Sequence, residues 1–111
     1  MTQIEARFSI GHAFSVRFCR GLFQPDSHAL AEVVADGRRR VQFFVDQGVL
    51  TAIPDLATTI PAWCAAHADS LIFAGLEPVI GGEAIKNDPE LVDDICNKAR
   101  RARLCRHSTI V

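Results

Sequence analysis

The stretch "RRRVQFFVDQGVL", residues 38–50, decides the fold. Its centre, "VQFFV", is a short and largely apolar run that ends at Asp46. A run of this kind suits a strand that is buried on both faces, as strands of parallel sheets are. The stretch therefore predicts a parallel strand with an acidic residue at its carboxyl end.

Helices and strands alternate along the rest of the chain. Three segments have the starts, spacings or stops of helices: "QPDSHALAEVVADG" (24–37), "PDLATTIPAWCAAHAD" (54–69) and "NDPELVDDICNKARRARLC" (87–105). The second contains Pro61, so we expect a helix that either begins near Thr59 or is kinked there. Two more strands are predicted at "SLIFAGLEPVI" (70–80), where Gly75 interrupts the pattern, and at "STIV" (108–111).

The amino-terminal segment alternates apolar residues with others. The runs "IEARFSI" (4–10) and "AFSVRFC" (13–19), separated by "GH", predict a β-hairpin. The whole order predicts an α/β fold: a partial Rossmann-like parallel sheet with helices on both faces, preceded by this hairpin. Because the last strand has no helix after it, we expect residues 1–111 to be the amino-terminal part of a larger domain.

The composition argues against several partners. The 111 residues include 12 basic and 13 acidic side chains, a net charge of −1 that gives no general attraction to nucleic acid or to an anionic membrane. The basic run at 98–106 falls in the last turns of a predicted helix, where positive charge is favoured by the helix dipole. No apolar run is long enough to span a bilayer, and the first residues lack the pattern of a secretory signal, so we expect a cytoplasmic protein.

The four cysteines have neither the spacing of a zinc ribbon nor that of a redox dithiol. Reduced and mostly buried thiols are the simpler expectation. The four histidines also lack metal-ligand spacing.

Three side chains are candidates for a binding site. Asp46 follows a predicted strand, and Glu83 and Lys86 follow the next one, after Gly81 and Gly82. Carboxylates in such positions accept the hydroxyls of a ribose, an ammonium bonds the sugar or a phosphate, and glycines let a ligand approach the backbone. A turn-forming aspartate in "DQG" and a solvated Glu83 with Lys86 are the alternatives.

These segments resemble a known family. "FFVDQGV" (43–49), "GGEAIKN" (81–87) and "LCRHSTIV" (104–111) are similar to the amino-terminal nucleotide-binding region of 3-dehydroquinate synthase and related sugar phosphate cyclases. "VRFCRGLFQPDSHALAEVV" (16–34) is similar to a 3-dehydroquinate synthase-like subgroup of these enzymes. The resemblance covers nearly the whole chain. It implies that Asp46, Glu83 and Lys86 contact the adenosine ribose of NAD.

One position departs from the family pattern. The synthase often has an asparagine two residues after the aspartate, whereas this chain has Gly48. The change removes one side-chain bond to the cofactor and favours the synthase-like subgroup.

The resemblance also implies a reaction. Family members use NAD to oxidise a sugar phosphate, eliminate phosphate, reduce the ketone again and close the ring by an aldol step, with zinc or cobalt as Lewis acid. The metal ligands of the family lie in a carboxyl-terminal helical domain that this chain does not include, so we expect the chain alone to be inactive. A homodimer is one expected state, because the last strand leaves an unpaired edge.

Two alternatives from other classes remain. Iron-dependent alcohol and glycerol dehydrogenases also begin with a nucleotide-binding half, although "GGEAIKN" fits the cyclase pattern better. The second alternative is that the chain is a non-catalytic, truncated α/β module.

Overall fold

The computed structural model describes residues 1–34 and 37–111. The elements are, in chain order, α1 (Ala29–Val34), β1 (Arg39–Asp46), α2 (Gln47–Ala52), α3 (Leu56–Ala66), β2 (Leu71–Val79), the 3-10 helix η1 (Glu83–Asn87), α4 (Pro89–Arg101) and β3 (Thr109–Ile110).

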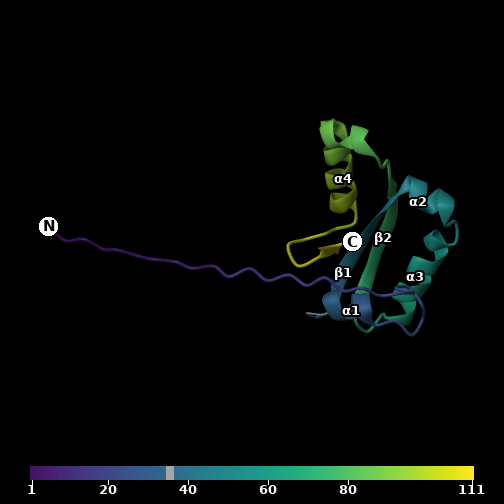
Figure 1. Ribbon diagram of the computed structural model, residues 1–111, viewed down its shortest axis with the longest axis horizontal. Helices are drawn as coiled ribbons and strands as arrows, with labels where there is room; N and C mark the ends of the chain where they lie inside the picture. Colours follow the sequence, from purple (N-terminus) through teal and green to yellow (C-terminus); the bar gives the residue numbers. More distant parts are fainter. Residues whose placement is uncertain (35–36) are drawn as a thin grey trace.

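The three strands form one parallel sheet in the order β2-β1-β3, so the α/β class with a parallel sheet is confirmed, and β1 is the central strand. The chain crosses from β1 to β2 in one direction and from β2 back to β3 in the other. Right-handed crossovers in opposite directions place their helices on opposite faces of a sheet. Accordingly, α2 and α3 lie on one side of the sheet and α4 on the other (Figure 1).

The hydrophobic core lies between the sheet and the helices α1 and α3. Trp63 of α3 is the largest fully buried side chain, and its Nε1–H donates to the carbonyl of Ser27 at 3.0 Å. Phe23 packs edge-on against both Trp63 and Phe43, with ring centroids 5.7 and 6.0 Å away, and so ties the loop before α1 to the core. The remaining core residues are Ala31, Val34, Val41, Ile60, Cys64 and Leu71.

The opposite face of the sheet is more polar. Gln42 points away from the apolar core side, is 1% exposed, and has no hydrogen-bond partner for its Oε1 atom among the described residues. Arg40 donates twice to the carbonyl of Ala102, at 2.9 and 3.2 Å, and thereby attaches the end of α4 to the sheet. No described residue of α4 is buried. The two crossovers are therefore held to the sheet by different interactions.

The interruption predicted at Gly75 is a β-bulge. Val41 pairs with Phe73 and Gln42 pairs with Gly75, so Ala74 is an extra residue on β2. Gly75 has φ +154°, and its open side faces the carboxamide of Gln42.

The expected β-hairpin is wrong. Residues 1–19 have no regular secondary structure and are exposed. The first part of this segment extends away from the rest of the chain (Figure 1), whereas Arg17 pairs with Glu32 of α1 at 2.9 Å. A two-residue loop at Gly11 and His12 sets Ile10 opposite Ala13, and hence the apolar residues of one run opposite the polar or small residues of the other. Because directly opposed residues share a face, that hairpin has no continuous apolar face to bury.

Three helix predictions are refined. The first helix is confirmed only over Ala29–Val34, because turns occupy the residues before it and its expected end falls at 35–36, outside the described residues. The helix containing Pro61 begins at Leu56 rather than near Thr59. The short helix α2 was not predicted. In contrast, α4 starts as expected, with Asp88 accepting from the backbone N–H of Glu90 at 3.0 Å and Pro89 in the first turn.

We expect the substitution Gly75→Ala to lower the free energy of unfolding by about 1–3 kcal/mol. A Cβ atom at this φ is strained and would lie 2.9 Å from Gln42 Oε1. Gly11→Ala is the matched control, because a Cβ there meets nothing within 4 Å. Urea unfolding of the two variants measures the difference, and equal midpoints would contradict the role given to the bulge.

Candidate nucleotide-binding edge

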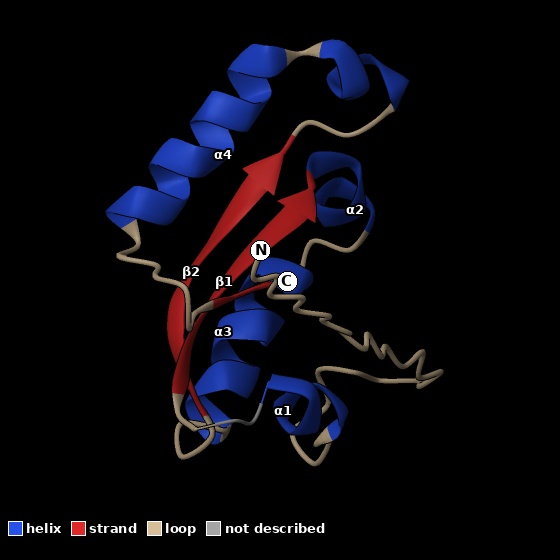
Figure 2. Cartoon of the chain, turned by 90° about the vertical axis from the view of Figure 1, so that its left-hand side faces the viewer, coloured by secondary structure: helices blue, strands red, loops and turns tan. Residues whose placement is uncertain are grey.

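The carboxyl ends of β1 and β2 bring two of the predicted segments together. Asp46 is the last residue of β1 and pairs in register with Val79, the last residue of β2. The carboxylate of Asp46 lies directly against Gly81, where an added methyl group would overlap its Oδ2 atom. Figure 2 shows both strands ending at the same edge of the sheet, beside the loop that leads to α4. Asp46 is therefore in contact with the segment that contains Glu83 and Lys86.

Asp46 also has a structural role. Its Oδ1 atom accepts the backbone N–H of Gly48 at 2.6 Å and caps the amino end of α2. The two interpretations of Asp46 from the sequence are thus compatible, because a carboxylate has two oxygens with about four lone-pair sites. One oxygen caps the helix, and the side chain remains exposed at the edge of the sheet.

Glu83 and Lys86 lie on η1 and form an ion pair with each other. Lys86 Nζ is 2.9 Å from both carboxylate oxygens of Glu83. The side chains are 87% and 67% exposed, so water screens the pair, and such pairs contribute only about 0–1 kcal/mol. Both groups are therefore accessible to a ligand at little cost.

The two glycines before Glu83 have different roles. Gly81 is required by the close approach of Asp46, so the expectation that its backbone is open to a ligand is wrong. Gly82 has φ +99°, and a Cβ built on it meets nothing within 4 Å. The open surface next to Glu83 is thus at Gly82, and its backbone conformation favours glycine.

Two of the hollows elsewhere on the described surface lie beside α3 and beside α4. One, of about 410 Å³, is lined mainly by apolar groups of α3 and of the loop before α1: Phe23, Gln24, Pro25, Thr58, Thr59, Ala62, Trp63 and Ala66. The other, of about 220 Å³, lies between the polar face of the sheet and α4, and its lining residues are Gln42, Ala74, Gly75, Glu77, Lys98, Arg101 and Ala102. Neither includes Asp46, Glu83 or Lys86. The candidate site is an edge and not one of these cavities.

The cysteines are free, as expected, but three of the four are exposed, so the prediction that most are buried is wrong. Burial raises the pKa of the Cys64 thiol to about 11. The backbone N–H of His107, 3.4 Å from Cys105 Sγ, and the hydroxyl of Ser108 lower the pKa of the Cys105 thiol below 9.0. Spacing along the sequence gave no signal of this local turn.

Two general features complete the description of these residues. Within 1–34 and 37–111, no three His, Cys, Asp or Glu side chains come together as a metal site. No helix in the described part of the chain is both long and apolar enough to cross a membrane.

No family model, curated protein or solved structure matches this chain. The resemblance to sugar phosphate cyclases therefore depends on the sequence blocks themselves.

We expect Asp46→Ala to lower the free energy of unfolding by about 1 kcal/mol, because α2 loses its cap. Asp46→Asn keeps a side-chain oxygen for the N–H of Gly48 and should change stability by only a few tenths of a kcal/mol. Urea unfolding tests both. If the alanine variant were as stable as the asparagine variant, the cap would contribute nothing.

We expect Cys105 to be alkylated by iodoacetamide faster than Cys64 at every pH from 7 to 9. Deprotonation precedes attack, and the two thiol pKa values move in opposite directions. Removing the hydroxyl donor in Ser108→Ala should shift the alkylation profile of Cys105 to higher pH. Mass spectrometry of tryptic peptides gives both rates, and an unshifted profile would contradict the effect of Ser108.

Proposed function

We propose that the carboxyl edge of β1 and β2 binds the adenosine ribose of NAD, and that the chain is the amino-terminal NAD-binding part of a 3-dehydroquinate synthase-like sugar phosphate cyclase. The observation that supports this proposal most is the packing of Asp46 against Gly81, two residues before Glu83. This contact joins Asp46 to the segment that contains Glu83, and the family pattern assigns both carboxylates to one ligand.

The chemistry of the edge fits a ribose. Asp46 and Glu83 are exposed carboxylates, which accept hydrogen bonds from neighbouring hydroxyls, and Lys86 is a donor. Open space at Gly82 allows a sugar to approach the backbone. In parallel sheets, ligands bind outside the carboxyl ends of the strands, which is where these groups lie.

Each side chain has a defined task in this proposal. Asp46 is held by its own cap and by Gly81, so it presents a fixed acceptor without a further loss of side-chain freedom. Glu83 accepts the other hydroxyl after turning from Lys86, and the released ammonium bonds the sugar or neutralises a phosphate oxygen. The Glu83–Lys86 pair keeps both charges satisfied while no ligand is bound.

Bound NAD supplies the oxidation and later reduction of the sugar phosphate, and this chain's residues bind and orient its adenosine end. No step is assigned to zinc or cobalt, because the described residues contain no group that fits either metal. Substrate binding and ring closure belong to the proposed full-length enzyme, and the chain alone should bind NAD without turnover.

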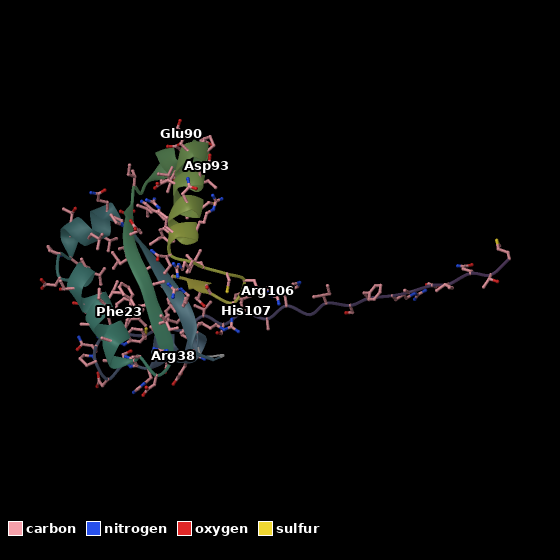
Figure 3. The ribbon with its side chains drawn as sticks, turned by 180° about the vertical axis from the view of Figure 1, so that it is seen from behind. Phe23, Arg38, Glu90, Asp93, Arg106 and His107 are labelled. Atoms are coloured by element: carbon pink, nitrogen blue, oxygen red, sulfur yellow. The ribbon has the colours of Figure 1, made fainter. Side chains whose placement is uncertain are left out.

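Calorimetry with NAD tests this site directly. We expect Glu83→Gln, Lys86→Met and Asp46→Asn each to weaken binding by about ten-fold, the usual effect of removing one charged hydrogen bond. Asp46→Asn is the most informative variant, since it keeps the helix cap and removes only the charge. Asp93→Asn is the matched control, because Asp93 is an exposed carboxylate on α4 (Figure 3).

Competition by fragments of NAD shows whether the adenosine ribose is the part that binds. ADP-ribose should compete with NAD, whereas nicotinamide mononucleotide should not, because the edge contacts only the adenosine ribose. Binding that all three substitutions leave unchanged would place NAD elsewhere. A folded chain, verified by circular dichroism, that binds no NAD would overturn the proposal.

A further inference from the structure

The amino-terminal segment has one strict apolar face. In an extended chain, residues with even numbers share one face and residues with odd numbers share the other. Every large apolar side chain from residue 4 to residue 18 has an even number: Ile4, Phe8, Ile10, Phe14, Val16 and Phe18. Gly11 lies between the two halves, so the pattern continues through the residues first interpreted as a turn.

This face is not covered by the rest of the chain. The exposed fractions of Ile4, Phe8, Phe14 and Phe18 are 91%, 90%, 92% and 96%. Figure 3 shows the first part of the segment running out from the rest of the chain, with no other element beside its side chains. A contiguous row of exposed aromatic and branched residues marks an interaction surface.

The segment is complementary to itself. In an antiparallel pair centred on Gly11, Glu5 of one strand is opposite Arg17 of the other. The same register sets Phe8 opposite Phe14, Ala6 opposite Val16 and Ile4 opposite Phe18, and only Ile10, next to the centre, is opposite a polar residue, His12. A one-residue slip loses all of these pairs, because it opposes even-numbered to odd-numbered residues.

We propose that residues 4–18 of two copies of this chain pair as antiparallel strands about a two-fold axis at Gly11, forming a homodimer. The contact is isologous, so each favourable pair occurs twice. In the single chain, Glu5 pairs with Arg7 at 2.6 Å and Arg17 with Glu32 at 2.9 Å. All four side chains are at least half exposed, so these pairs exchange readily for the pairs between strands. The proposal is independent of NAD binding.

Sedimentation velocity on the full chain gives the first test. Wild type should form a dimer at higher concentration, and Phe8→Asp should weaken it by about a hundred-fold, because the substitution acts twice in each dimer. Ser9→Asp is the matched control. It adds the same charge one residue away on the polar face, and it should change the dissociation constant by no more than about three-fold. A wild type that stays monomeric overturns the proposal.

Charge-reversal variants distinguish pairing between two chains from a hairpin within one chain. Glu5→Arg and Arg17→Glu each set like charges opposite one another in a homodimer, so each variant alone should dimerise weakly. In a mixture of the two variants, both charge pairs of the heterodimer become complementary, and the mixture should recover wild-type association. A hairpin within one chain, with a three-residue loop at Ile10, Gly11 and His12, makes the same residue pairs but gains nothing from mixing. Failure of the mixture to associate therefore overturns the proposal, with circular dichroism confirming that each variant is folded.

Discussion

The register between β1 and β2 is the constraint on which the candidate site depends. The bulge at Ala74 shifts that register by one residue, so that Asp46 pairs with Val79 and its carboxylate reaches Gly81. Without the extra residue, Asp46 would be opposite Pro78. The loop that follows β2, which contains Gly81, would then begin one residue further beyond the end of β1. Bulges are known to redirect side chains near functional sites, and this one aligns the ends of the two strands. The bulge requires glycine at position 75. Its φ is strained for a residue with a Cβ atom, and the side chain of Gln42 occupies the space that a Cβ atom would need.

Much of the central fold followed from local patterns. The apolar run "VQFFV" identified β1, the sequence "NDPE" identified the start of α4, and Gly75 was recognised as an interruption. These features are encoded within a few neighbouring residues, by burial, capping and backbone freedom. The grouping of Asp46 with the loop after β2 was also predictable, because parallel strands end at a common edge. The atomic basis of that grouping was not, since it needs the shifted register.

The errors share a physical cause. Alternation in residues 4–18 predicts strands but says nothing of a pairing partner, because strand pairing is non-local, and the structure shows no strand in this segment. The short helix α2 has little sequence signal, since "QGVLTA" contains glycine and a β-branched valine, and it depends on the cap from Asp46. Gly81 was interpreted as free space for a ligand, although its space is filled by a side chain 35 residues earlier in the sequence.

The two halves of the proposed ribose site differ in how they are organised. Asp46 is fixed by two contacts with the fold, whereas Glu83 and Lys86 contact each other in water. Separating an exposed pair costs about 0–1 kcal/mol, and each charged hydrogen bond to a ligand returns about 1.5–3 kcal/mol. Replacing the Glu83–Lys86 ion pair by hydrogen bonds to the ligand is therefore favourable without any movement of the strands. On this argument the ligand first meets an acceptor that is already in place, and the charges on η1 then rearrange around it.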